Sequence, residues 1–416
     1  MSTWRVKLSL SLNYFVFAIL LNSVGIVILQ VINNYGIPES SASVLEAFKD
    51  LSIAIVSFFI ASFLPRIGYK RSMLIGLALV TVACFSMPFL GSFLMTKVLF
   101  ATVGVAFALI KVSVYSTVGL ITADAKEHAG FMSTVEGIFM VGVLSGYWIF
   151  GFFIDDSGVA SESWLNAYWI LGTLTTLAFL LLFSTALDEH EIAPEKSGFV
   201  EDFMGMLRLA LKPLVFVFVV SAFLYVLLEQ GIGTWLPTFN NKVLQLKSAM
   251  SVQIVSIFAG TTALGRLLGG QVLKRFHWFK VLSGAILGMM GLVLLILPLT
   301  HNIEPGSVSG WMDAPIAAYI FPAIGLFLGP IYPAINSVIL TSLPKRLHSA
   351  MTGLIVIFSA LGGTTGSVVT GFFFGRYDGQ TAFYLTLIPM AMLLVVLYFF
   401  NHFSKSLEVQ AGEVAG

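Results

Sequence analysis

Three ionisable residues, Lys111, Glu136 and Glu229, lie inside long apolar stretches and are the first candidates for chemistry. An ionised side chain in the hydrocarbon of a bilayer costs at least about 2.5–3.5 kcal/mol on insertion scales, so such residues are usually functional. We expect Lys111 and Glu136 to face the interior of a helix bundle near mid-membrane depth. There they either pair with each other, as a structural ion pair, or leave Lys111 free to receive an anionic group.

Glu229 precedes Gln230, Gly231 and Gly233 in a separate apolar stretch. Glycines of this kind permit bending of a helix. Burial in apolar surroundings disfavours the charged form of a carboxyl group, which allows the group to bind and release a proton near neutral pH. The pattern predicts proton exchange at Glu229; the alternative is a carboxylate that is hydrogen-bonded to a neighbouring helix.

Glu46, Lys49 and Asp50 form a third group. Positions i, i+3 and i+4 share one face of a helix, so Lys49 should be matched with Glu46. Asp50 lies about one turn deeper and is a further candidate for proton coupling. We expect this group near the outer membrane interface, where a solvated structural role is the alternative.

The composition indicates the class of structure that holds these residues. Hydrophobic residues make up 57% of the 416 positions and charged residues only 10%, whereas soluble domains carry about 25% charge. The net charge of +1 gives no basic surface for nucleic acid. The single cysteine, Cys84, excludes a disulfide within the chain, and six scattered histidines give no metal-binding pattern. No nucleotide-binding or hydrolase motif is present, so we expect no cofactor, no metal and no enzymatic activity.

A helix needs about 20 mostly apolar residues to cross the hydrocarbon, because each backbone polar group must be satisfied internally. The sequence predicts twelve such segments: 8–32, 43–64, 72–92, 95–122, 128–154, 164–187, 213–236, 248–273, 279–300, 314–341, 347–374 and 380–403. The first segment follows Arg5 and Lys7 but exceeds the apolar core of a signal peptide, so we expect it to be retained. Pro322, Pro330 and Pro333 predict kinks in the tenth segment.

The stretch 188–212 is the most polar of the chain. The expected architecture is therefore an all-α integral membrane protein with an N-terminal six-helix bundle over 1–187, a cytoplasmic linker over 188–212, and a C-terminal six-helix bundle with a short cytoplasmic tail over 213–416. Two such halves indicate a duplicated architecture.

Basic residues in the short loops predict the orientation, because they accumulate on the cytoplasmic side. Four basic residues fall on the expected outer side, namely Lys97, Lys242, Lys247 and Arg376. Those on the other side are Arg5, Lys7, Arg66, Lys70, Arg71, Lys126, Lys196, Arg208, Lys212, Lys274, Arg275, Lys280, Lys345, Arg346 and Lys405. Both termini should be cytoplasmic, in the plasma membrane of a bacterium.

The loop after the second segment reads Ala-Ser-Phe-Leu-Pro-Arg-Ile-Gly-Tyr-Lys-Arg over 61–71. It resembles the signature loop of the major facilitator superfamily, G-x-x-x-D-R-x-G-R-R, in Arg66, Gly68 and Lys70, with Arg71 continuing the basic run. Pro65 stands where that family has its aspartate, so the resemblance does not extend to the carboxylate. An ordinary positive-inside loop is the alternative.

A narrower resemblance lies in the second half. The stretches 224–237, 264–270 and 325–333 are similar to helices 7, 8 and 10 of the fucose–proton symporter branch. The superfamily resemblance implies two six-helix bundles whose helices 1, 4, 7 and 10 line a central cavity. The residues that it would place there are Asn22, Ser23, Gln30, Lys111, Tyr115, Glu229, Gln230, Trp235, Tyr332 and Asn336.

These features together predict a secondary active transporter of a small polar solute, a sugar or similar metabolite, by alternating access. Substrate contacts are expected from Asn22, Lys111, Tyr115, Gln230, Trp235 and Asn336. Coupling would use a proton, or alternatively sodium, through Glu229, Glu136 or Asp50, and the expected partners are the solute, the ion and the bilayer around a monomer. An organic-anion or siderophore transporter that uses Lys111 is the first alternative; a membrane enzyme or sensor is the second.

Overall fold

The computed structural model describes residues 3–122, 124–157, 160–187, 208–301, 303, 308, 310–343 and 347–415. Regular structure in these residues is helical throughout. The chain divides into two compact units. Unit 1 comprises Met1–Lys196 and Lys247–Ser256, and unit 2 comprises Ser197–Leu246 and Ile257–Gly416. The predicted linker falls largely on 188–207, outside the described residues.

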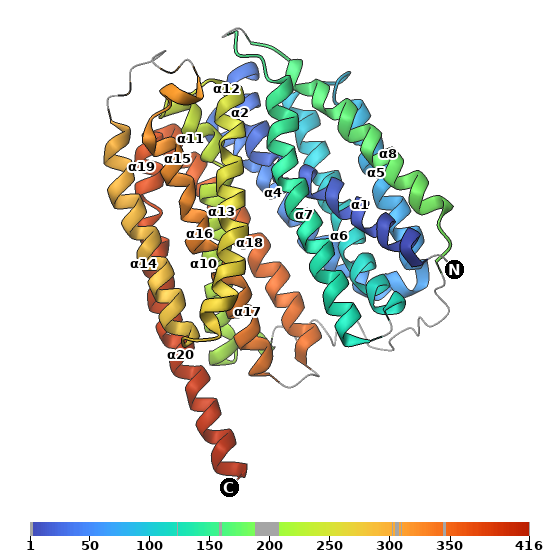
Figure 1. Ribbon diagram of the computed structural model, residues 1–416, viewed down its shortest axis with the longest axis vertical. Helices are drawn as coiled ribbons and strands as arrows, with labels where there is room; N and C mark the ends of the chain where they lie inside the picture. Colours follow the sequence, from blue (N-terminus) through green and yellow to red (C-terminus); the bar gives the residue numbers. More distant parts are fainter. Residues whose placement is uncertain are drawn as a thin grey trace. The chain divides into compact units, whose positions relative to one another are not determined.

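Unit 1 is built from long helices with short connections (Figure 1). Its elements are α1 (Thr3–Asn22), α2 (Val24–Tyr35), α3 (Glu39–Ala42), α4 (Val44–Ile67), α5 (Tyr69–Ser86), α6 (Phe93–Ile121), α7 (Ala125–Phe153), η1 (Ser163–Asn166), α8 (Ala167–Ser184) and α12 (Ser248–Gln253). The principal packing pairs are α4 with α6, α1 with α7, α5 with α6 and α5 with α8.

Unit 2 is also helical, with more interruptions (Figure 1). Its elements are α10 (Pro213–Gly233), α11 (Leu236–Lys242), α13 (Val255–Leu273), α14 (Trp278–Ile296), η2 (Leu297–Thr300), η3 (Trp311–Asp313), α15 (Ile316–Ile320), η4 (Phe321–Ala323), α16 (Ile324–Leu328), α17 (Ile331–Thr341), α18 (His348–Arg376), α19 (Gly379–Tyr384) and α20 (Leu387–Ala415). The closest packing is between α10 and α18.

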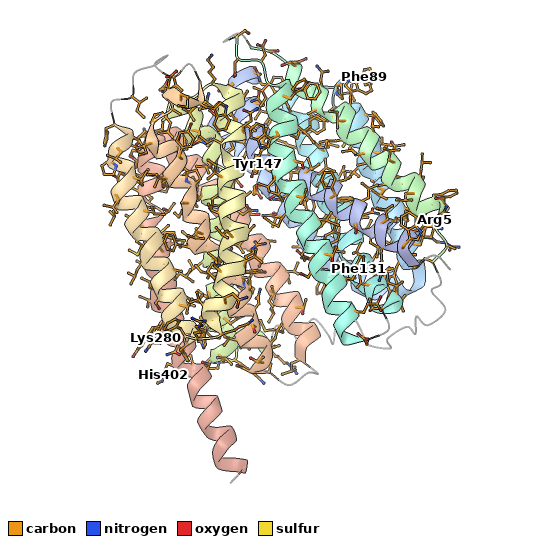
Figure 2. All side chains as sticks on the ribbon, in the orientation of Figure 1. Arg5, Phe89, Phe131, Tyr147, Lys280 and His402 are labelled. Atoms are coloured by element: carbon orange, nitrogen blue, oxygen red, sulfur yellow. The ribbon has the colours of Figure 1, made fainter. Side chains whose placement is uncertain are left out.

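The predicted membrane fold is confirmed. Eleven stretches of the described residues are long and apolar enough to cross a bilayer. The 24-residue helix α4 occupies the remaining expected segment, so the predicted count of twelve agrees with the helices found. Large apolar side chains such as Phe89, Phe152 and Leu295 are exposed, and Phe89 projects outward in Figure 2. An apolar surface of this kind is suited to contact with lipid acyl chains.

Several of the predicted segments are interrupted. The seventh breaks between Gly233 and Leu236, the eighth at Ile254 and the twelfth between Tyr384 and Leu387, in addition to the tenth and the first. The tenth is divided into α15, η4, α16 and α17, with Pro322 inside η4 and Pro330 immediately before α17. This confirms the predicted kinks at Pro322 and Pro330, whereas Pro333 lies inside α17 without an interruption. The first segment also breaks, between Asn22 and Val24, where neither proline nor glycine is present. That break was not predicted.

Glycines let helices approach closely within each unit. A Cβ atom at Gly104 of α6 would lie 2.3 Å from the backbone oxygen of Lys49 in α4. In unit 2, Cβ atoms at Gly362 and Gly366 of α18 would lie 2.4 and 2.2 Å from the carbonyl oxygens of Phe223 and Leu227 in α10. Small residues spaced by four are typical of tightly packed membrane helices. These crossings fix the depth at which the polar residues of neighbouring helices meet.

Candidate functional site

Unit 1 holds a buried group of three charges on α4. Glu46, Lys49 and Asp50 are 0%, 5% and 7% exposed, which contradicts the alternative of a solvated role for this group. The Lys49 Nζ atom forms an ion pair with Glu46 Oε1 and lies 3.4 Å from Asp50 Oδ1. Pairing of Lys49 with Glu46 follows the predicted i, i+3 spacing. Two carboxylates therefore share one ammonium group, and all three groups are buried among the packed helices.

This triad adjoins the break in the first segment. Lys49 Nζ lies 3.5 Å from the carbonyl oxygen of Leu21, the penultimate residue of α1. Carbonyl groups at a helix end lack partners within the helix, so a lysine can satisfy one of them. At the same break, Ser23 Oγ donates to the Leu20 oxygen at 2.8 Å and the exposed Asn22 donates its amide to the Ala18 oxygen at 2.8 Å.

A second polar group of unit 1 joins α6 and α7. The Tyr115 hydroxyl donates to Glu136 Oε1 at 2.8 Å. Lys111, one turn before Tyr115, places its Nζ 5.8 Å from the centre of the Phe107 ring. The Tyr14 ring of α1 lies 6.1 Å from that of Tyr115. We call Tyr14, Lys111, Tyr115 and Glu136 the α6–α7 cluster.

Lys111 and Glu136 do not form the direct ion pair that was one of the two predicted arrangements. Among the described residues Lys111 makes no ion pair or hydrogen bond, although the charge of Glu136 acts on it from farther away. Lys111 is half-buried, and Glu136 and Tyr115 are exposed within unit 1. Because lipid tails solvate such groups poorly, this face is suited to a polar cavity rather than to hydrocarbon.

Unit 2 holds a third polar group around Glu229 on α10. The Tyr225 hydroxyl donates to Glu229 Oε1 at 2.9 Å, and Arg266 of α13 places Nη2 3.6 Å from the same oxygen. The Glu229 and Arg266 side chains are 27% and 40% exposed. We call Tyr225, Glu229 and Arg266 the α10–α13 cluster. Arg266 was not among the predicted site residues, and the structure pairs it with Glu229.

Aromatic stacking extends this cluster to α17 and α18. The Tyr225 and Tyr332 rings stack with 5.2 Å between their centroids, and the Tyr332 hydroxyl lies 2.9 Å from Ser359 Oγ. Asn336 is one turn farther along α17, and its Oδ1 atom is buried without a hydrogen-bond partner in the described part of the chain. A buried amide oxygen with unused acceptor capacity is suited to a hydroxyl or amine donor of a ligand.

Gln230 and Trp235, both predicted to contact the substrate, differ in accessibility. Gln230 is half-buried and lies 3.5 Å from the Thr234 hydroxyl. Trp235 is fully buried, and its indole N–H donates to the Ser367 carbonyl at 3.0 Å. In this conformation Trp235 therefore holds α18 in place and presents no surface to a solute.

The stretch 61–71, predicted as the signature loop, is mostly helical: 61–67 end α4 and 69–71 begin α5, with Gly68 alone between them. Gly68 adopts φ = 89°, a conformation that favours glycine, and so permits the turn into α5. Lys70 Nζ donates to the Phe183 carbonyl at 3.0 Å and so caps the end of α8. Arg71 is exposed, and the side chain of Arg66 lies outside the described residues.

Tyr14, Tyr225 and Ser359 were missed as site residues by sequence reasoning. Tyr225 had a usable signal, because it precedes Glu229 by four positions and so shares its helix face. The contacts of Tyr14 and Ser359 join different helices and have no signal in the sequence. Among the described residues no group of histidine, cysteine or carboxylate side chains is arranged to hold a metal ion.

Two helical units with polar clusters inside their spanning helices define an integral membrane transporter fold. Residues 10–364 match the model of the Major Facilitator Superfamily. The chain belongs to this family, whose members are transporters and not enzymes, and the predicted family is confirmed.

Relatives by sequence are distant or partial. The chain is 31% identical over 172 residues to Bypass of stop codon protein 6 of Saccharomyces cerevisiae, covering 40% of this chain and 32% of that relative. It thus spans about a third of the length of the yeast protein. It is 20% identical over 389 residues to Protein TsgA homolog of Buchnera aphidicola, covering 92% of each.

Solved structures share the fold over nearly the whole chain. A bacterial homologue of the human lysosomal transporter Spinster has a TM-score of 0.72 at 14% identity, covering 97% of this chain and 96% of that chain. The D-xylose–proton symporter has a TM-score of 0.69 at 14% identity, with 96% and 97% covered. The Escherichia coli fucose–proton symporter has a TM-score of 0.60 at 14% identity, with 96% and 99% covered. These likenesses show the fold alone.

Proposed function

We propose that this transporter moves a small polar solute, a sugar or similar metabolite, by proton-coupled symport with alternating access. The observation that carries the proposal is the α6–α7 cluster, which places an amine, a phenol and a carboxylate within membrane-spanning helices with accessible surface. Hydroxyl groups of a solute can accept from Lys111 and donate to Glu136. The symporters of xylose and fucose among the structural neighbours support the same solute class.

Glu229 is our first choice for the coupling carboxylate. Arg266 and a proton compete for the same side chain, because protonation removes the charge that attracts the guanidinium 3.6 Å away. A proton that binds Glu229 would thus release Arg266 and change the contact between α10 and α13. Asp50 is held by Lys49 in the interior, and Glu136 makes no direct ion pair with Lys111 that a proton could release, so these two remain second choices. The sodium alternative would use the same carboxylates.

We further propose that the protein acts as a monomer in a bacterial inner membrane with both termini in the cytoplasm. The support is the asymmetry of lysine and arginine between alternate loops of the sequence.

Accumulation assays in proteoliposomes test the proposed function. With an inward proton gradient, we expect at least one member of a panel of radiolabelled sugars, nucleosides and organic acids to accumulate above equilibrium, because proton entry supplies the free energy. A protonophore should remove that accumulation. Accumulation that survives the protonophore but requires external sodium would identify sodium, and not the proton, as the coupling ion. Absence of accumulation for the whole panel under both gradients would contradict the proposal.

An organic anion is a second candidate solute, favoured by the absence of a direct ion pair at Lys111. A Lys111→Gln variant should then lower the uptake rate of an anionic panel member about tenfold to hundredfold, since a hydrogen bond to a charged group contributes about 1.5–3 kcal/mol. Lys97→Gln, on the same helix α6, is the matched control and should keep the wild-type rate. If uptake of the transported solute is equal in Lys111→Gln and wild type, the anion candidate fails.

A further inference from the structure

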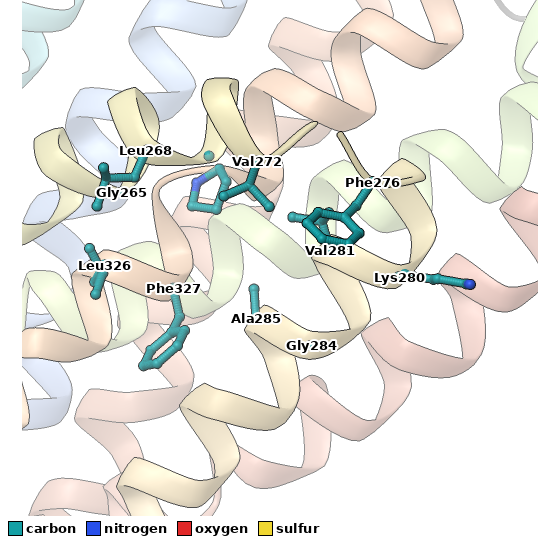
Figure 3. A pocket seen from close by; sticks show the side chains of 12 residues that line it. Gly265, Leu268, Val272, Phe276, Lys280, Val281, Gly284, Ala285, Leu326 and Phe327 are labelled. Carbon is teal, nitrogen blue, oxygen red and sulfur yellow. The ribbon is translucent and has the colours of Figure 1, made fainter. Parts of the chain in front are cut away.

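An apolar groove of about 440 Å³ opens on unit 2 between α13, α14 and the α16–α17 segment. Figure 3 shows the side chains that line it. They are Gly265, Leu268, Gly269, Val272, Phe276, Lys280, Val281, Gly284, Ala285, Leu326, Phe327 and Pro330. We propose that this groove binds one anionic phospholipid, with an acyl chain along the apolar lining and the phosphate group beside Lys280.

Glycines on two facing helices hollow the groove. On the α13 side, Gly265 and Gly269 lie so close to the α16–α17 segment that Cβ atoms there would come within 2.2 Å of the Leu326 oxygen and 2.3 Å of Pro330 Cβ. On the α14 side, a Cβ atom at Gly284 would meet no atom within 4 Å. The floor of the groove is therefore tightly packed and its α14 wall is open. The volume falls in the range of about 300–1,000 Å³ typical of ligand sites.

The lining requires an apolar occupant. Leu268, Val272 and Phe276 are exposed, with Phe276 exposed to 60%. Leu268 and Val272 lie in one candidate membrane span, and Gly284 and Ala285 lie in the next. An acyl chain that lies along these residues removes their exposed apolar surface from polar contact. The groove thus fits a lipid tail better than a polar metabolite.

The charge at one end of the groove selects the headgroup. Lys280 is the charged residue of the lining, and Figure 3 shows it at the end of the groove beyond Phe276 and Val281. It lies near the start of α14, after the turn that carries exposed Lys274 and Arg275. The aromatic Trp278 begins that helix, as is common where a span meets the headgroup region. A basic group at this level attracts an anionic headgroup by about 1 kcal/mol per residue.

Native mass spectrometry of the purified full-length protein tests this site, with palmitoyl-oleoyl phosphatidylglycerol and phosphatidylcholine as probes. We expect the first phosphatidylglycerol to bind about fivefold more tightly than phosphatidylcholine, the factor that one basic residue supplies. Lys280→Gln should remove this preference and retain the binding of phosphatidylcholine. The preference should also weaken in high salt, because salt screens exposed charges.

The filling variant Gly284→Leu should weaken the first binding event for both lipids at least about tenfold, because its side chain occupies the space of the acyl chain. Gly291→Leu is the matched control, since it lies on the same helix, also has no atom within 4 Å of its Cβ position, and does not line the groove. Melting temperatures of both variants verify folding. Unchanged lipid affinity in a folded Gly284→Leu protein overturns the proposal. A dimer that Gly284→Leu dissociates also overturns it, because a second copy would then be the occupant.

Discussion

Replacement of Lys49 by methionine is expected to destabilise the protein by about 3–5 kcal/mol, the usual loss when one partner of a buried ion pair is removed. Lys49 lies between the carboxylates of Glu46 and Asp50, both buried, and it also reaches the Leu21 carbonyl at the end of α1. Methionine keeps most of the length and removes the charge. The buried carboxylates of Glu46 and Asp50 would then lose the ammonium group that they share. Thermal unfolding of the detergent-solubilised protein measures this loss as a lower melting temperature.

The triple variant Glu46→Gln, Lys49→Met, Asp50→Asn is the control for this prediction. Neutralisation of a whole buried ion group is often near-neutral for stability, so the triple variant should recover most of the loss. A Lys49→Met protein that melts like the wild type at neutral pH would show that the triad is not a stabilising unit.

The spanning helices could be predicted because the signal is local. A run of about 20 apolar residues satisfies its own backbone as a helix, whatever the rest of the fold does. The breaks at Pro322 and Pro330 in the tenth segment could likewise be predicted, because proline lacks the N–H donor that a regular helix needs. The break after Asn22 is different. It is accompanied by hydrogen bonds from Ser23 and from Lys49 on another helix, and no local pattern announces the second of these.

Site residues could be predicted one helix at a time. Lys111 and Tyr115 are four positions apart on α6, so their sharing of one helix face could be read from the spacing alone. Contacts between helices depend on crossing angles and depths that the sequence does not specify. The contact between Glu229 on α10 and Arg266 on α13, with 3.6 Å between the charged groups, is of this kind and has no signal in the sequence.

The burial of the triad was misjudged for a related reason. Position along α4 suggested an interface, where charges are solvated. The close crossing of α4 and α6 at Gly104 instead covers this part of α4, and the end of α1 covers the ammonium group. Whether Asp50 exchanges a proton stays a prediction, although its pairing with Lys49 favours a structural role over rapid exchange.

Glu229→Gln is expected to abolish gradient-driven accumulation while preserving exchange of the solute across the membrane. Glutamine can still accept the hydrogen bond from the Tyr225 hydroxyl, so the local packing of α10 should survive. It can neither take up a proton nor attract Arg266, and the step that links proton binding to the α10–α13 contact is lost. Accumulation under an inward proton gradient should therefore fall to the equilibrium level. Counterflow with solute on both sides should stay within about threefold of wild type.

Two further variants decide whether the effect belongs to the ion pair. Arg266→Gln leaves Glu229 able to titrate but removes its competitor, so accumulation should fall while counterflow persists. Glu39→Gln, at a half-buried carboxylate at the start of α3 outside both clusters, should behave like wild type in both assays. Full accumulation by Glu229→Gln would move the coupling role to Glu136 or Asp50. The same two assays on Glu136→Gln and Asp50→Asn would then separate these, since the coupling variant alone keeps counterflow without accumulation.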